Sequence, residues 1–273
     1  MDQEVKEIFS EGSTSYYYSS LFFPRDVRED VFKFYAYVRT ADDFVDEEPQ
    51  DAEGLEKFRE KTVENWNSGE SDDKIVNYFL EVARKHDFEK EWVEAFLDSM
   101  AMDLEKSEYE TMDETLEYIY GSAEVIGLMM AKILDLDEES YGSAEMLGRS
   151  MQFCNFLRDI REDREELGRR YMPREEMEKH ELETLEKEEF DTENFEDFIQ
   201  DQLEKYENWQ SKAEDGFKYI PYRTRVPVIL SSRLYRWTAR QIRKSPEVVF
   251  EREVRPSKLR ISFELLKSLL GRK

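Results

Sequence analysis

The stretch SAEMLGRSMQFCNFLRDIREDREELGRRYMP, residues 143–173, arranges its side chains in stripes at the spacing of an α-helix. One stripe holds small, amide and carboxylate side chains at intervals of three or four residues: Gly148, Gln152, Asn155, Asp159 and Asp163. The neighbouring positions are hydrophobic: Met151, Cys154, Leu157 and Ile160. Residues three and four apart share one helix face. The stretch therefore predicts a bundle helix that lines a polar cavity with one strip of its surface.

A second helix with carboxylates on its inner face is predicted by DVREDVFKFYAYVRTADDFVDEEP, residues 26–49. Its hydrophobic stripe continues, one turn at a time, from Tyr35 and Val38 into Asp42 and Asp46. Buried carboxylates are costly unless a cation or a metal compensates them. The alternative interpretation is that the register slips near Thr40 and that these carboxylates face solvent.

Two facing helices, each with two carboxylates one turn apart, indicate a metal site between them. Oxygen ligands favour Mg²⁺, a hard cation that binds carboxylates together with substrate phosphates, and Mn²⁺ is the alternative ion. The predicted ligands are Asp42, Asp46, Asn155, Asp159 and Asp163. Such a cluster would hold a diphosphate and assist its departure.

The rest of the chain predicts an all-α fold in one domain, residues 1–273. Proline is absent between Pro49 and Pro173, and period-two alternation of Val, Ile and Thr is lacking. The stretch 174–190 predicts a short helix and a surface loop. Longer helices are expected at residues 27–48, 51–67, 72–86, 89–106, 112–134, 140–166, 191–215, 224–244 and 257–270.

Composition excludes several classes of protein. The net charge of −25 argues against nucleic acid as a partner. The excess of acidic residues has two interpretations: solvated helix faces, or adaptation of the protein to a salty cytoplasm. One cysteine, Cys154, excludes a disulfide framework, and the two histidines lie in charged surroundings that disfavour His-based catalysis. Without an apolar N-terminal segment or a run of about 18 apolar residues, the chain is expected in the cytoplasm.

The two carboxylate helices resemble those of the squalene/phytoene synthase family, the head-to-head prenyl transferases. The family's first aspartate-rich motif matches RTADDFVD, residues 39–46, and its second, N-x-x-R-D-x-x-x-D, matches residues 155–163. GRRYMP follows at residues 168–173. The resemblance extends to the Ser-rich opening at 12–18, to a pocket-lining kinked helix containing YIYGSAEVIG, and to a C-terminal element near residue 250. It covers roughly residues 10–265.

The resemblance implies an isoprenoid synthase bundle with a central cavity, which joins two allylic prenyl diphosphates through a cyclopropylcarbinyl diphosphate. The favoured reaction converts geranylgeranyl diphosphate into phytoene, because the GRRYMP segment and the strong acidity favour a carotenoid-type product. Squalene or dehydrosqualene from farnesyl diphosphate stays open, and NADPH is expected only for squalene. Three further hypotheses compete with this one: a head-to-tail elongase or terpene cyclase, a non-catalytic scaffold of the same fold, and a plain acidic binding module.

The resemblance also assigns roles to residues. The catalytic set is Asp42, Asp46, Asp159, Asp163, Tyr35, Tyr118 and Tyr171. The substrate-binding set is Ser13, Ser15, Tyr16, Arg39, Gln152, Asn155, Arg158, Arg170 and Gly127. Core packing is the competing interpretation for each tyrosine. Either Arg252 or Arg255 would be the family's C-terminal base, and Glu124 departs from the small or neutral residue usual at its position.

The C-terminal segment, residues 257–273, is the one basic stretch in this acidic chain. At helical spacing one face carries Leu259, Phe263, Leu266 and Leu270. This pattern suits a helix that lies on an anionic membrane surface, such as the inner membrane face. The alternative is an ordinary closing helix that packs Leu266 and Leu270 against the bundle.

Overall fold

The computed structural model describes residues 2–12, 14–187 and 190–270, without the side chains of residues 11–15 and 270. These residues form helices connected by short loops, with no β-strand; one isolated parallel bridge pairs Glu108 with Arg170. The predicted all-α fold is confirmed. The longer helices in the described ranges are α1 Gln3–Gly12, α3 Arg25–Asp46, α4 Ala52–Glu64, α5 Lys74–Lys85, α6 Lys90–Glu105, α9 Tyr141–Arg158, α12 Thr192–Glu214, α13 Tyr222–Lys244 and α15 Lys258–Leu270. The shorter ones are α2 Thr14–Ser20, α7 Met112–Ile119, α8 Val125–Ile133, α10 Ile160–Glu165, α11 Arg174–Glu178 and α14 Val248–Glu251, with the turns η1 Tyr120–Glu124, η2 Glu138–Ser140 and η3 Asp215–Tyr219.

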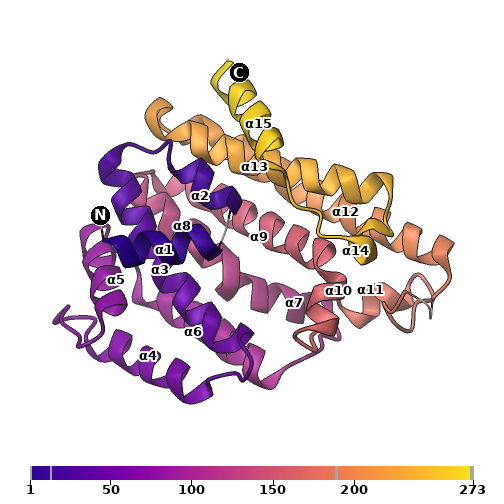
Figure 1. Ribbon diagram of the computed structural model, residues 1–273, viewed down its shortest axis with the longest axis horizontal. Coiled ribbons are helices and arrows are strands. Elements are labelled where there is room, and N and C mark those ends of the chain that lie inside the picture. Colours follow the sequence, from indigo (N-terminus) through magenta and orange to yellow (C-terminus); the bar gives the residue numbers. More distant parts are fainter. Residues whose placement is uncertain (1, 13, 188–189, 271–273) are drawn as a thin grey trace.

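Helix α9 runs through the middle of the molecule (Figure 1). It packs on α8 and η1 on one side and on α12 and α13 on the other. Helix α3 packs on α1, α5 and α6. The hydrophobic core accordingly has two main parts, one around α3 to α6 and one around α9, α12 and α13. The two helices predicted to carry the carboxylate pairs thus belong to opposite halves of the bundle.

Local sequence explains where several helices begin. Asp51, Asp73 and Asp191 are N-cap residues whose carboxylates accept hydrogen bonds from backbone N–H groups of α4, α5 and α12. Pro24 precedes α3, where a missing N–H costs nothing. A helix occupies each predicted range, with ends that differ by a few residues.

Two predicted continuous helices are interrupted. The range 112–134 divides into α7, a π-helical turn η1 and α8; the family resemblance implied a kink here, and a π-helical turn is a common cause of one. The range 140–166 breaks at Asp159, between α9 and α10. Helices α1 and α2 were not predicted; in α1, buried Val5 and Phe9 stand four residues apart within an otherwise acidic segment.

Glycines allow α9 to approach the kinked helix closely. A Cβ atom on Gly148 would lie 2.2 Å from the carbonyl oxygen of Ala123, and one on Gly127 would lie 2.3 Å from that of Ala144. Any larger side chain at either position would push the two helices apart. This crossing fixes the position of α9 relative to η1 and α8.

No helix within the described residues is both long enough and apolar enough to cross a membrane.

Candidate active site

A cavity of about 900 Å³ lies between the two halves of the bundle. Most of its wall is apolar, with side chains from α3, α8, α9 and α13. Carboxylates and arginines gather in one part of it, on α3 and around the α9–α10 junction. The cavity therefore combines a long hydrophobic space with a charged region.

Helix α3 contributes Tyr35, Arg39, Asp42 and Asp46 to the cavity wall. The Arg39 guanidinium lies 3.2 Å from a carboxylate oxygen of Asp42 and 2.6 Å from one of Asp43. Asp43 itself is not part of the wall. The facial assignment from the sequence, with Asp42 and Asp46 facing inward and Asp43 off the stripe, agrees with this placement.

The opposite wall receives the polar stripe of α9 and α10, namely Gln152, Asn155, Asp159 and Asp163, together with Arg158. The Asn155 amide donates to Gln152 at 3.2 Å. Arg158 binds both carboxylate oxygens of Asp159, with its Nε atom 2.7 Å from Oδ1. This bidentate pair sits where the helix breaks, so Arg158 and Asp159 point into the cavity together.

The two carboxylate pairs influence each other electrostatically. Burial, and then the charge of Asp46, raise the pKa of Asp42 to about 8. Burial and the charge of Asp159 hold the pKa of Asp163 well above its ordinary value, and Asp46 contributes from the opposite helix. The arginines that pair with Asp42, Asp46 and Asp159 therefore offset only part of the negative charge at this end of the cavity.

This donor set fits divalent cations. Among the residues that the structure describes, seven carboxyl groups line the cavity against three guanidinium groups, those of Arg39, Arg158 and Arg255. Among the described residues, no three carboxylate, histidine or cysteine side chains converge on one point as a finished metal cluster. Ions such as Mg²⁺ are commonly held by one or two carboxylates, with phosphate oxygens and waters completing the shell. The facing pairs suit that kind of shared binding.

A buried hydrogen-bond network lies next to Asp46 and was not predicted from the sequence. Asp103 of α6 accepts hydrogen bonds from the hydroxyls of Tyr118 and Tyr171, at 2.7 and 2.8 Å. Burial raises the pKa of Asp103 to about 6, although the nearby Arg169 opposes that effect. The sequence did contain a signal: Asp103 continues the Phe96 and Met100 stripe at helical spacing, as Asp42 does on α3.

The tyrosine hydroxyls are thus committed to Asp103, and their rings form part of the cavity wall. Tyr171 stacks on Phe156 with ring centroids 4.3 Å apart and planes 6° apart. What these residues offer to the cavity is chiefly an aromatic face, which attracts positive charge.

The sequence pattern of one protein family, described as squalene/phytoene synthase, matches residues 9–260. The chain belongs to the squalene/phytoene synthase family. A 15-cis-phytoene synthase of a Paracoccus species is 27% identical over 92% of this chain and 85% of its own length. Another 15-cis-phytoene synthase, from Pantoea ananas, is 27% identical over 88% of this chain and 86% of its own length. Membership makes the chain a prenyltransferase of the phytoene and squalene synthase type.

Solved structures share the fold of this squalene/phytoene synthase family member. A dehydrosqualene synthase in complex with a ligand superposes with a TM-score of 0.86, at 22% identity, over 97% of this chain and 94% of its own. A squalene synthase from Alicyclobacillus acidocaldarius gives a TM-score of 0.79, at 20% identity, over 88% of this chain and 92% of its own. The expected isoprenoid synthase bundle with a central cavity is confirmed.

The GRRYMP segment of this family member requires a correction. Arg170 was predicted to bind phosphate, but it is not part of the cavity wall; its guanidinium binds Glu108 and the carbonyl of Met172. Arg169 is the buried arginine, 2.8 Å from Asp46 and 3.1 Å from the hydroxyl of Tyr171. Residue 170 makes the β-bridge with Glu108. In such an extended segment successive side chains point to opposite sides, so only one arginine faces inward.

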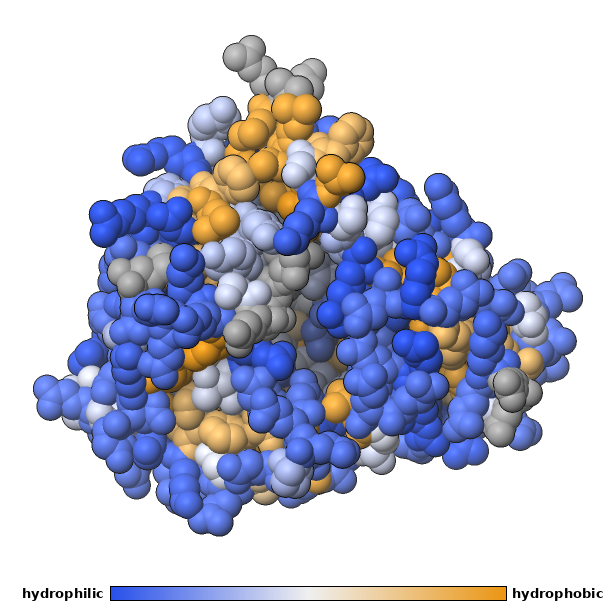
Figure 2. All heavy atoms as spheres, in the orientation of Figure 1, coloured by the Kyte–Doolittle hydropathy of each residue, from blue (hydrophilic) through white to orange (hydrophobic). Residues whose placement is uncertain are grey.

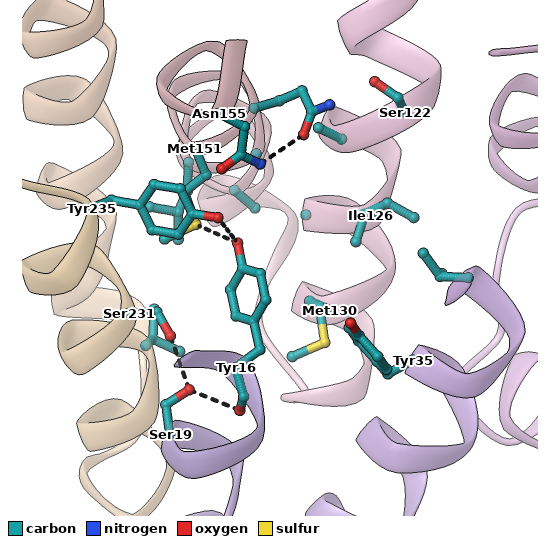
Figure 3. A pocket seen from close by; sticks show the side chains of 18 of the residues that line it. Tyr16, Ser19, Tyr35, Ser122, Ile126, Met130, Met151, Asn155, Ser231 and Tyr235 are labelled. Atoms are coloured by element: carbon teal, nitrogen blue, oxygen red, sulfur yellow. Dashed lines mark hydrogen bonds between the residues drawn. The ribbon is translucent and has the colours of Figure 1, made fainter. Parts of the chain in front are cut away.

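The N-terminal residues of the predicted site are partly described. Ser13, and the side chain of Ser15, lie outside the described residues. Tyr16 lines the cavity, and its hydroxyl donates to that of Tyr235 at 2.8 Å (Figure 3). Tyr35 points into the same pocket from α3. Gly127 lies in the wall as well, at the helix crossing.

The structure also places the residues whose roles the sequence left open. Arg255 lines the cavity with its guanidinium 3.5 Å from Glu162, whereas Arg252 lies outside the wall; both arginines are exposed. Glu162 also lies in the wall. Glu124 does not; it is buried on the other side of η1, 2.6 Å from Arg149.

Proposed function

We propose that the chain, as one domain over residues 1–273, joins two molecules of geranylgeranyl diphosphate head to head to give phytoene. The observation that carries this proposal is the pair of facing carboxylate sets, Asp42 with Asp46 and Asp159 with Asp163, at one end of a largely apolar cavity. The 27% identity to phytoene synthases over most of the chain supports the choice of substrate.

The charged end of the cavity would bind the two diphosphates. Bound Mg²⁺, or Mn²⁺, would neutralise them and act as a Lewis acid at the departing oxygens. Asp42, Asp46, Asn155, Asp159 and Asp163 are the proposed ligands. Arg39, Arg158 and Arg255 would hold phosphate oxygens, for which the planar guanidinium is suited, while Gln152 would orient them.

The apolar part of the cavity would hold the prenyl chains and exclude water. One C–O bond breaks with departure of diphosphate, and the allylic cation is captured by the double bond of the second substrate, with loss of a proton. The resulting cyclopropylcarbinyl diphosphate loses its diphosphate, rearranges and releases a second proton. Tyr35, Tyr118 and Tyr171 present ring faces that would stabilise these cations. Tyr16, Ser13 and Ser15 are proposed to complete the binding of substrate.

The deciding experiment incubates the pure protein with geranylgeranyl or farnesyl diphosphate, each with and without NADPH, and identifies the hydrocarbon. Phytoene from the first substrate without NADPH is expected. Squalene or dehydrosqualene from farnesyl diphosphate would replace the proposal with the shorter-chain reaction. No hydrocarbon from either substrate in the presence of Mg²⁺ would favour a non-catalytic scaffold.

We also propose that the protein works in the cytoplasm at the inner face of a membrane, which it contacts through residues 257–273. Prenyl diphosphates and their hydrocarbon products partition into bilayers, so an enzyme that exchanges them benefits from contact with lipid.

A further inference from the structure

Helix α15 exposes large hydrophobic side chains on the side that faces away from the bundle. Leu259 is 85% exposed, Phe263 49%, Leu266 53% and Leu269 53%. Figure 2 shows hydrophobic residues gathered over the end of the molecule where Figure 1 labels α15. A helix on a protein surface usually turns polar residues outward. The outer side of α15 does the reverse.

Other residues of α15 pack its inner side against the bundle. Ile261 is 5% exposed and forms a cluster with Leu230 and Leu234 of α13. Leu266, which could have closed the bundle, is half exposed instead. Packing on the bundle therefore does not account for the outer hydrophobic row.

The charges beside this row are cationic. Lys258, Arg260 and Lys267 flank it, while the single acid of the helix, Glu264, is 7% exposed and pairs with Arg260 at 3.2 Å. The whole chain carries a net charge of −25. A basic, apolar helix on an acidic protein is complementary to a surface that is both apolar and anionic.

Two further hydrophobic side chains are exposed at the turn between α2 and α3, shortly after a residue that contacts α15. Leu21 and Phe22 are 37% and 43% exposed, although Ser20 and Phe23 on either side line the cavity. One turn earlier, Tyr18 packs against the cluster beneath α15, and the Lys258 ammonium lies 6.0 Å from its ring centroid. We call Leu21, Phe22, Leu259, Phe263, Leu266 and Leu269 the outer apolar face.

The outer apolar face lies close to the cavity. Leu234 of α13 both lines the cavity and packs in the cluster with Ile261. Arg255 and Pro256 line the cavity and directly precede the first turn of α15. At the α2–α3 turn, residues 21–22 are exposed on the surface, and the residues on either side of them, 20 and 23, line the cavity.

We propose that the outer apolar face docks on an anionic lipid bilayer, and that prenyl chains pass between bilayer and cavity at the Leu21–Phe22 turn. This inference rests on the proposed function, because it takes the cargo to be prenyl chains. Binding through hydrophobic insertion and cationic side chains should be strong on anionic lipid and weak on neutral lipid. The turn is the point where the cavity wall and the membrane-facing surface are formed by one short piece of chain.

Vesicle flotation tests the docking. The protein should float with phosphatidylcholine vesicles containing phosphatidylglycerol at low salt, and at least about tenfold less with phosphatidylcholine alone or at 0.5 M salt. Leu259→Glu/Phe263→Glu should reduce the bound fraction by at least about tenfold, and Lys258→Gln/Lys267→Gln should reduce it on anionic vesicles. Tyr120→Glu is the matched control, because Tyr120 is 40% exposed on η1, outside the outer apolar face. Equal flotation of all variants would overturn the proposal. A change in the oligomeric state of the Glu variants in the absence of lipid would also overturn it, because it would show that a second copy of the chain covers this face.

Exchange at the turn is tested with Leu21→Ser/Phe22→Ser. The variant should retain the detergent-dispersed rate within about twofold but lose at least about fivefold in repeated turnover of geranylgeranyl diphosphate supplied in vesicles. An equal loss in detergent would show that the turn shapes the cavity rather than an exchange route. The wild-type protein separates the two proposals: inactivity in detergent with every substrate rejects the proposed function, whereas full activity without flotation rejects only the membrane face.

Discussion

The Arg169 guanidinium lies 2.8 Å from a carboxylate oxygen of Asp46, and its other terminal nitrogen donates to the backbone carbonyl of Val45 at 2.5 Å. The same guanidinium is 3.7 Å from Asp103. Arg169 therefore ties the end of α3 to the tyrosine network while remaining 3% exposed. It fixes the direction in which Asp46 faces the cavity without entering the cavity itself.

We predict that Arg169→Ala lowers turnover by about a hundredfold, because a carboxylate displaced by about 1 Å no longer meets its partners. The free energy of unfolding should also fall, by about 3 kcal/mol, since Asp103 is left buried without its cation. Arg170→Ala is the matched control and should cost under about 1 kcal/mol, because its partner Glu108 is half exposed.

A double-mutant cycle separates positioning from general damage. Arg169→Ala added to Asp46→Asn should reduce turnover little beyond Asp46→Asn alone, because both changes act through one carboxylate. Fully additive losses would contradict the positioning role.

The aspartates can be ranked by where they point. Asp42→Asn or Asp159→Asn should cut turnover by at least about a hundredfold while leaving the fold intact, because each removes charge that would stabilise the departing diphosphate. Asp43→Asn should matter much less, since Asp43 pairs with Arg39 outside the cavity wall. Steady-state turnover with circular dichroism as a folding check measures this, and equal losses for all three would refute the facial assignment.

Divalent metal should control activity in a pH-dependent way. We expect EDTA to abolish turnover and Mg²⁺ to restore it. With the pKa of Asp42 raised to about 8, protons compete with the cation at neutral pH. The apparent affinity for Mg²⁺ should therefore rise with pH up to about 8 and then level off, and Asp42→Asn should flatten that rise. Full activity in chelator, or affinity that falls as pH rises, would reject the metal site.

Stability at acidic pH can be followed at Asp30, far from the carboxylate pairs. Burial raises its pKa, but hydrogen bonds from His86 at 2.9 Å and Lys85 at 2.6 Å outweigh burial, and the net pKa lies below the ordinary value of 3.8. A lowered pKa stabilises the folded state above pH 3.8, and this stabilisation is lost as pH falls through the folded-state pKa. In urea titrations Asp30→Asn should lower the free energy of unfolding by about 2 kcal/mol at pH 7, and by clearly less at pH 3. The same deficit at both pH values would show that charge is not the cause.

Periodicity was sufficient to predict the longer helices after α2 and both carboxylate pairs, because each depends on positions three and four apart along one helix. Contacts between distant segments were not predictable in that way. Nothing local distinguishes Arg169 from Arg170; the bridge to Glu108 decides which one turns inward. Tyr118 and Tyr171 were found through the family resemblance, but their shared partner Asp103 belongs to a helix that carried no motif.

The N-terminal helix α1 was not predicted, because acidic residues obscure its short hydrophobic stripe. It nevertheless supplies part of the cavity wall. Lys74 of α5 holds it through Asp2 and Glu4, at 3.0 and 2.7 Å. Phe9 lines the cavity, is 1% exposed, and stacks on Tyr35 with ring centroids 3.9 Å apart and planes 19° apart. This stack both seals the cavity and holds the Tyr35 ring in place.

Phe9→Ala should therefore admit water to the cavity, where it traps allylic cations as prenyl alcohols. We expect the ratio of alcohol to hydrocarbon product to rise by about tenfold or more, while Phe9→Leu, which keeps most of the volume, gives an intermediate ratio. Chromatography of products from geranylgeranyl diphosphate measures it. Val5→Ala is the matched control: Val5 is also 1% exposed on α1 but lies outside the cavity wall, so this variant should lose stability without changing the products. If Val5→Ala produced as much alcohol as Phe9→Ala, looser docking of α1 would explain the leak and the stack on Tyr35 would have no separate role.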